Sequence, residues 1–360
     1  FMLFYGRYAR NDAICVFLGI TALYAFLRFF ETRHTKHLYL FTISLALNFT
    51  AKETAYIFSA QFLLFLLIVF IRDVAFSKTF DKNIKQRLIL TNILLIIGIS
   101  VSVLASVYFF NKAYSGPKPS DLSAIVNAQS SFNLNQILSV TVPLLKFALP
   151  GILPLIFGVC LFLILKKYLN WNLLRPSSTF IVLILTGTLV LPLLAPFLVR
   201  FSGMDPSAYS DPYVVLTNYV FISFLFLLSF LIGSFWNQTH WWKLAIVFYA
   251  IYAVLYTTFF TNSMGLMTGM VGSLGHWLSQ QSVQRGGQPS YYYAFFLIPI
   301  YEYLSAVGTL LAFYIGIKHR SFWKSRSSEA DISQQVSNEQ IQVNISDQIS
   351  VESELVFSDQ

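Results

Sequence analysis

Residues 7–12 place charged side chains directly before a long apolar run, and those residue types could bind an anion. Arg7 and Arg10 are three positions apart, and Asp12 follows them. On a helix, residues three apart share a face, so the two guanidinium groups could hold a phosphate through paired hydrogen bonds. The alternative is that these side chains only anchor the end of a membrane span at the lipid headgroups.

A second charged pair, Lys52 and Glu53, separates two apolar runs that have almost no loop between them. Ionisable residues near the hydrocarbon boundary are costly, so they serve a function or pair with one another. Two explanations stand side by side here. The pair either contributes to a binding site or forms a local ion pair that closes a tight helical hairpin.

The longest polar stretch between two late apolar runs covers residues 261–293 and ends with three tyrosines, including Tyr292. Four glycines precede His276, and Arg285 is followed by two glycines and Gln288. Glycine allows a backbone to approach a ligand closely, whereas the tyrosines alone fit an interfacial aromatic belt. Glu302 lies in the next apolar run, roughly 13 Å deeper on a helix, and should face a partner or a wet cavity.

The composition of the whole chain sets the environment of these segments. Of the 360 residues, 56% are hydrophobic and only 11% are charged, and the mean hydropathy is +0.63. Soluble domains have about 25% charged residues, so a soluble enzyme is excluded, as are a disulfide scaffold and a chain that is disordered throughout. Long continuous apolar runs, rather than short alternating segments, predict an all-α, polytopic transmembrane helical bundle.

The apolar runs give about nine candidate spans, although the second is short and two others contain prolines. Proline is tolerated within a span where neighbouring groups satisfy the freed backbone. The nine ranges are 12–30, 38–51, 54–71, 88–110, 143–165, 179–199, 214–235, 244–260 and 291–317.

Lysine and arginine are unevenly divided between alternate connections. One set of connections holds sixteen of these residues and the other set holds eight. Because cytoplasmic loops carry the excess of positive charge, the richer set is predicted to be cytoplasmic. The sequence therefore predicts a multi-pass protein of the cell membrane, with the N-terminal end of this chain outside and the C-terminal tail in the cytoplasm.

The C-terminal tail differs in character from the rest of the chain. Residues 325–360 hold one arginine and seven acidic residues, while the whole chain carries a net charge of +8. A segment rich in serine, glutamine and acidic residues buries little apolar surface, so we expect a membrane domain over residues 1–320 and a disordered acidic cytoplasmic tail over 321–360. The basic cytoplasmic rim fits anionic lipid rather than nucleic acid, so the lipid bilayer is the expected partner.

Several familiar chemistries have no sequence signature here. There is no phosphate-binding P-loop, no dinucleotide fingerprint and no Cys/His cluster, so we expect no metal site built from this sequence. The chain also begins with Phe1, Met2 and Leu3 and has no signal sequence. We therefore expect that an N-terminal piece precedes it.

Three blocks together resemble a known family. They are residues 8–12 with the span that ends at Leu27 and Arg28, residues 51–54, and residues 258–302. The most specific part runs from Arg285 to Tyr293, with residues 299–302 after it. These blocks are similar to the flippase-activity-associated membrane proteins, which are related to the dolichyl-phosphate-mannose protein mannosyltransferases of glycosyltransferase family 39. The likeness covers roughly residues 1–320, and its middle, 110–215, is generic.

The resemblance implies a GT-C fold with its active site at the extracytoplasmic face and a polyprenyl-phosphate sugar as donor. The catalytic acidic residue, which can also hold a divalent cation, lies in a first outer loop that this chain lacks, and Asp12 does not replace it. The expected substrate-binding residues are Arg10, Asp12, Lys52, Glu53, Arg285, Gln288, Tyr292 and Glu302. The alternative function is a transporter or flippase for a lipid-linked saccharide, which would need a phosphate clamp but no base.

Overall fold

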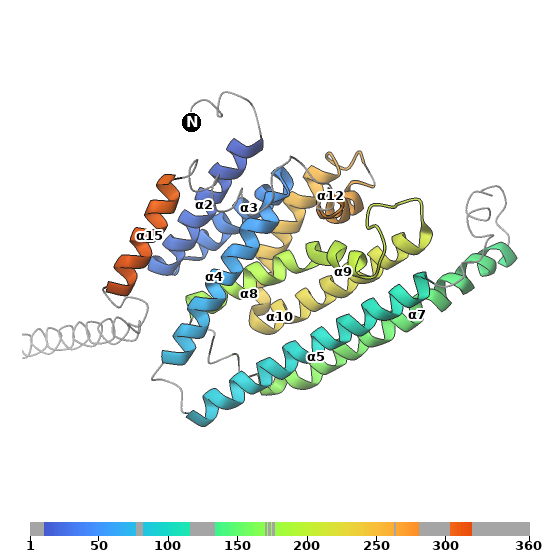
Figure 1. The fold of residues 1–360 in the computed structure, drawn as a ribbon, viewed down its shortest axis with the longest axis horizontal. Coiled ribbons are helices and arrows are strands. Elements are labelled where there is room, and N and C mark those ends of the chain that lie inside the picture. Colours follow the sequence, from blue (N-terminus) through green and yellow to red (C-terminus); the bar gives the residue numbers. More distant parts are fainter. Residues whose placement is uncertain are drawn as a thin grey trace, which may run out of the picture. The chain divides into compact units, whose positions relative to one another are not determined.

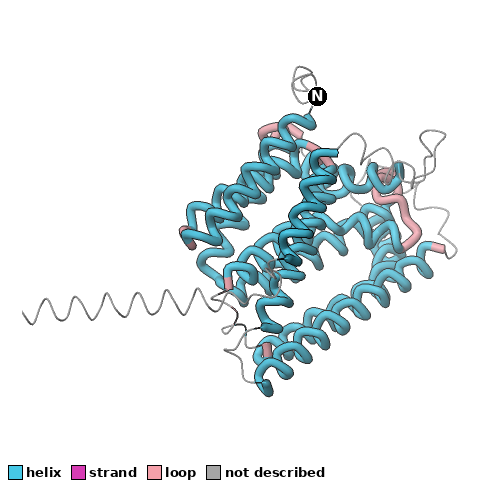
Figure 2. Tube along the Cα trace, turned by 60° about the vertical axis from the view of Figure 1, so that its left-hand side comes forward, coloured by secondary structure: helices cyan, strands magenta, loops and turns pink. Residues whose placement is uncertain are grey.

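A computed structural model describes residues 11–76, 82–115, 134–169, 171, 174, 177–262, 264–280 and 303–318. Every regular element in this part of the chain is a helix, as Figure 2 shows. The prediction of an all-helical fold is therefore confirmed for these residues.

The chain divides into two compact units. Unit 1 contains residues 1–69 and 86–284, and unit 2 contains residues 70–85 and 285–360. Within unit 2, α15 (Tyr303–Lys318) is an apolar helix whose last residue, Lys318, lies with its ammonium group 5.6 Å from the centre of the Tyr314 ring. All the packing described below belongs to unit 1.

Six helices among the described residues are long and apolar enough to cross a membrane. They cover Ala13–Thr32, Thr54–Val74, Ile89–Tyr114, Thr141–Tyr168, Ser178–Phe201 and Pro212–Asn237. Two further apolar helices, His240–Tyr256 and Val307–Lys318, are shorter. A helical membrane protein is thus supported, and the count of nine spans stays a prediction.

Helices α2 (Asn11–Thr32), α3 (Thr35–Ala51) and α4 (Thr54–Phe76) follow one another through very short connections. Aromatic side chains form the contact between them. The Phe62 ring lies edge-on to Phe26 at 4.9 Å between centroids and lies 5.5 Å from Phe41. Edge-to-face pairs of this kind add to the stabilisation from burial alone.

Helices α5 (Lys82–Tyr114) and α7 (Leu134–Leu165) pack closely because glycines remove side chains from their interface. A Cβ atom added to Gly151 would lie 2.3 Å from the Phe110 ring, and one added to Gly158 would lie 2.6 Å from the Ser102 hydroxyl. Small residues allow helix backbones to approach in membranes, where apolar surface alone does not drive association. The α5–α7 interface therefore depends on these two positions.

The next span is interrupted by prolines. Helix α8 (Ser178–Val190) passes into the 3₁₀ turn η3 (Leu191–Leu194) and then into α9 (Ala195–Phe201). Pro192 and Pro196 lack the backbone N–H that a continuous α-helix needs, which accounts for the change of helix type.

Helix α10 (Pro212–Tyr256) consists of two antiparallel halves. The backbone breaks at Asn237, whose side-chain oxygen accepts a 3.2 Å hydrogen bond from the N–H of His240 and so caps the second half. The rings of Phe226 and Tyr249, one in each half, lie 4.9 Å apart. These residues therefore form two separate apolar helices, as the ranges 214–235 and 244–260 predict.

Four connections meet at one end of unit 1, which we call the polar end: the turn at 52–53, the end of α5, the loop 202–211 and the segment 257–280. The side-chain amide of Asn111 donates to the Ser202 carbonyl at 3.1 Å, and the Tyr114 hydroxyl donates to Asp211 at 3.1 Å. Helix α12 (Ser273–Gln280) contacts α9 here (Figure 1). All four belong to the set of connections that is poor in lysine and arginine.

Candidate functional site

The turn between α3 and α4 confirms that almost no loop separates the two helices. The N–H of Lys52 bonds to the Asn48 carbonyl at 3.2 Å, and the N–H of Tyr56 bonds to the Glu53 carbonyl at 3.1 Å. Lys52 and Glu53 are therefore the only residues between Ala51 and Thr54. Glu53 lies at the N-terminus of α4, where the helix dipole favours a negative charge.

The two explanations for Lys52 and Glu53, a binding site or a local ion pair, both remain predictions. Among the described residues the ion pairs are Arg28 with Glu31 and Arg72 with Asp73. Both Lys52 and Glu53 are half-buried. A partly buried carboxylate is costly unless positive groups or hydrogen-bond donors surround it, so Glu53 is a candidate for binding a ligand.

Three hydroxyl groups meet near this turn. Ser273, the first residue of α12, lies beside the hydroxyl groups of both Tyr56 and Tyr256, and Glu53 acts electrostatically on both tyrosines. The Tyr256 hydroxyl itself donates to the Phe49 carbonyl at 3.2 Å. A carboxylate next to several hydroxyls can exchange hydrogen bonds with a polyhydroxylated ligand, because the carboxylate accepts and the hydroxyls donate or accept.

The glycines before His276 pack against protein rather than against an open site. A Cβ atom on Gly269 would lie 2.4 Å from the Tyr256 ring, and one on Gly272 would lie 2.7 Å from the Tyr209 hydroxyl. They belong to the single π turn η4 (Thr268–Gly272), which follows α11 (Gly265–Met267). Their close approach to Tyr256 and Tyr209 holds Ser273 beside the tyrosines.

Tyr209 belongs to the loop that supports this glycine face. Burial, and then the nearby Asp205 carboxylate, raise the pKa of its hydroxyl above the ordinary value. The hydroxyl therefore stays protonated at neutral pH and acts as a hydrogen-bonding group rather than as a base.

An unusual backbone turn links α10 to this glycine-rich segment. Thr258, Phe259 and Phe260 have φ values of 51°, 56° and 66°, in the left-handed region. Non-glycine residues rarely adopt that region, and each costs of order 1–2 kcal/mol there. The N–H of Phe260 is held by the Thr257 hydroxyl at 3.0 Å, and both phenylalanine side chains are exposed. Backbone strain of this kind clusters near functional sites.

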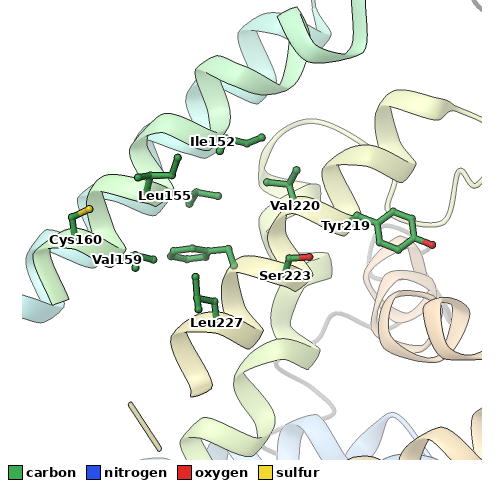
Figure 3. Close-up of a pocket in the computed structure, with 10 residues that line it drawn as sticks. Ile152, Leu155, Val159, Cys160, Tyr219, Val220, Ser223 and Leu227 are labelled. Atoms are coloured by element: carbon green, nitrogen blue, oxygen red, sulfur yellow. The ribbon is translucent and has the colours of Figure 1, made fainter. Parts of the chain in front are cut away.

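Two grooves run along the apolar body of unit 1. The larger, about 520 Å³, lies between α7 and α10. Figure 3 shows Leu155 and Val159 facing Val220 and Leu227 across it, while the Tyr219 ring points away from α7. The smaller, about 360 Å³, lies between α2, α3 and α4 and reaches the polar end; its lining residues are Cys15, Val16, Gly19, Ile20, Leu23, Asn48, Thr54 and Phe58.

The structure brings only part of the predicted set together. Lys52 and Glu53 are placed as described above. Asp12 belongs to the first turn of α2, but its side chain is outside the described part. The remaining predicted residues also lie outside the described residues; they are Arg10, Arg285, Gln288, Tyr292 and Glu302.

Sequence reasoning overlooked Asn48, Tyr56, Tyr256 and Ser273. Asn48 carried a usable signal, because it is an amide in an apolar run and lies four residues before Lys52. The tyrosines and Ser273 carried none, since their proximity comes from the packing of α4, α10 and α12.

No group of three or more His, Cys, Asp or Glu residues that could hold a metal ion occurs among the described residues. Comparison of the chain with protein-family models, with curated proteins and with solved structures gave no significant match.

Proposed function

We propose that this protein is an integral membrane glycosyltransferase that transfers a sugar from a polyprenyl-phosphate donor at the extracytoplasmic face. The observation that carries the proposal is the position of Glu53, a half-buried carboxylate at the start of α4 whose charge acts on Tyr56 and Tyr256, the two tyrosines that meet Ser273. The resemblance of residues 1–320 to the flippase-activity-associated proteins supports the same function.

The reaction explains why such groups would gather at the end of a membrane bundle. The bond between the anomeric carbon and the phosphate oxygen breaks, and the acceptor hydroxyl oxygen forms the new glycosidic bond. The proton of that hydroxyl passes to a base, and the polyprenyl phosphate departs as an anion. Cations stabilise the charge that develops on the phosphate, which is the role proposed for Lys52, with Arg10 and Arg285.

Glu53 is assigned to sugar binding and not to the role of base. In the family that the chain resembles, the catalytic carboxylate lies in an outer loop upstream of these residues. A carboxylate that accepts hydrogen bonds from sugar hydroxyls positions the donor while Lys52, the adjacent residue, lies next to the phosphate. Direct displacement in one step would invert the configuration at the anomeric carbon.

The test is the Glu53→Gln variant of the full-length protein in proteoliposomes, with radiolabelled polyprenyl-phosphate mannose, glucose and galactose and a membrane extract as the source of acceptors. Losing hydrogen bonds to a charged group costs about 1.5–3 kcal/mol, so transfer should fall about ten- to a hundredfold. Glu31→Gln is the matched control. Glu31 pairs with the exposed Arg28 in the last turn of α2 and does not belong to the Lys52–Glu53 turn.

Two results would contradict the proposal. An unchanged rate in Glu53→Gln would remove Glu53 from the site. Translocation of the donor across the bilayer by the wild-type protein, without any sugar transfer, would establish the transporter alternative.

A further inference from the structure

We propose that the turn after α10 inserts Phe259 and Phe260 among the acyl chains of the bilayer and so anchors residues 261–280 at the membrane surface. The turn consists of residues 257–262, which we call the phenylalanine turn. Its partner is the phospholipid bilayer itself. The inference goes beyond the proposed function and does not depend on sugar transfer.

The two phenylalanine rings protrude from the protein. Phe259 is 73% exposed and Phe260 is 74% exposed. Phenylalanine is among the residues most often buried, because its side chain gains free energy on leaving water. Two adjacent rings with this exposure mark a surface that meets lipid or another protein.

The backbone holds both rings outward in a costly conformation. The N–H of Phe259 bonds to the Val254 carbonyl at 2.8 Å, and the N–H of Asn262 bonds to the Thr257 carbonyl at 2.9 Å. Between these bonds residues 258–260 are left-handed, a conformation that residues other than Gly, Asn and Asp rarely adopt. Transfer of the two rings from water into hydrocarbon would offset the cost of this conformation.

The register of the two α10 halves places the phenylalanine turn at the hydrocarbon boundary. The rings of Phe226 and Tyr249 lie 4.9 Å apart, and the two halves run in opposite directions. The second half continues from this pair to Tyr256, so the turn that follows is level with residues 212–218 of the first half. These residues begin the span Pro212–Asn237, whose 26 residues exceed a hydrocarbon core of about 30 Å by only about 9 Å. The phenylalanine turn thus lies where acyl chains meet headgroups.

The chemistry of the turn favours lipid over a protein partner. Its six residues include no charged side chain. The Thr261 hydroxyl donates to the Thr258 carbonyl at 2.7 Å, and the Asn262 side-chain oxygen accepts from the N–H of Met264 at 3.2 Å. Leu255, in the last turn of α10, is 42% exposed, so the apolar surface of the helix leads into the turn. An uncharged turn that bonds its polar groups internally and presents two rings suits the boundary between headgroups and acyl chains.

The experiment measures the depth of nitroxide labels in the full-length protein, reconstituted in phosphatidylcholine vesicles. Cys15 and Cys160, the two cysteines of the chain, are first replaced by serine. A label on Phe260→Cys should collide more often with oxygen, which dissolves among acyl chains, than with a water-soluble nickel chelate present on both sides of the membrane. Its depth should be about 5–10 Å into the boundary between headgroups and acyl chains.

Labels at two other positions provide the references for this depth. Ile246, which is 59% exposed, lies in the second half of α10 about 15 Å from its end, so Ile246→Cys should report the hydrocarbon interior. Ser210 is an exposed residue of the loop 202–211 at the polar end, so Ser210→Cys should report water.

Two double variants test the anchoring role of the rings. Phe259→Asn with Phe260→Asn removes both rings, and asparagine tolerates the left-handed region. Met264 is 52% exposed just after the turn, and a label on Met264→Cys should then shift toward water by about 5 Å or more. Phe259→Leu with Phe260→Leu keeps apolar side chains and should leave that label at its original depth.

Three results would overturn the inference. More frequent collisions of the Phe260→Cys label with the nickel chelate, as at Ser210→Cys, would place the turn in water. Few collisions with either reagent would show that protein covers the turn. An unmoved Met264→Cys label in the asparagine variant would show that the rings do not anchor the segment that follows them.

Discussion

The hydroxyl of Tyr256 donates a 3.2 Å hydrogen bond to the backbone carbonyl of Phe49, across 207 positions of sequence. Phe49 lies in the last turn of α3, where helix carbonyls lack partners within the helix. The second half of α10 thus provides a hydrogen bond for a carbonyl group at the end of α3. This contact holds the Lys52–Glu53 turn near Tyr256 and Ser273.

Tyr256→Phe should therefore lower the free energy of unfolding by about 0.5–1.5 kcal/mol, because it removes one hydrogen bond and leaves the Phe49 carbonyl unsatisfied. The measurement is denaturant unfolding in detergent. Tyr24→Phe, on an exposed face of α2, is the control and should change little. Equal stability of both variants would show that water satisfies the carbonyl equally well.

The π turn gives a second prediction. Gly269→Ala places a methyl group 2.4 Å from the Tyr256 ring, so the ring or the backbone must shift, at a cost of about 1–3 kcal/mol. Gly187→Ala is the matched change in α8, where the new Cβ atom meets Leu63 at 3.9 Å. There alanine should be neutral or stabilise the helix by up to about 1 kcal/mol. Thermal unfolding of the two purified variants distinguishes them, and a stable Gly269→Ala protein would mean that the glycine face is not tightly packed.

The orientation in the membrane is tested by cysteine labelling of intact cells. The excess of lysine and arginine in one set of connections predicts that Ser123 is outside and that Ser350 is in the cytoplasm. In a variant lacking Cys15 and Cys160, an impermeant maleimide should label Ser123→Cys before lysis and Ser350→Cys only after lysis. The opposite pattern would invert the topology and place the polar end in the cytoplasm.

Arg285 lies outside the described residues, so its prediction rests on the sequence. If its guanidinium group holds the donor phosphate, Arg285→Lys should already slow transfer, because an ammonium group cannot make the planar two-point contact. Arg285→Ala should lose about 1.5–3 kcal/mol, or about ten- to a hundredfold in rate. A lysine variant with the wild-type rate would identify Arg285 as an interfacial anchor, which needs only a long stem and a positive charge.

The sequence by itself determined the helical membrane character of this protein. An apolar run of about 20 residues is long enough for a helix to cross the hydrocarbon core of a bilayer, and both the runs and the composition can be read without a structure. It also located the turn at Lys52 and Glu53, since two charged residues between apolar runs leave little alternative. The same local reasoning separated the two halves of α10 around Asn237, which the structure confirms.

Only the tertiary structure decided which groups meet near the Lys52–Glu53 turn. Tyr56, Tyr256 and Ser273 lie on α4, α10 and α12, and their meeting depends on helix packing that no local pattern encodes. The tertiary structure also decided the role of Gly269 and Gly272. The sequence was compatible with a close approach of these glycines to a ligand, whereas in the structure they pack against Tyr256 and Tyr209. A glycine permits close approach, and only the fold specifies what approaches it.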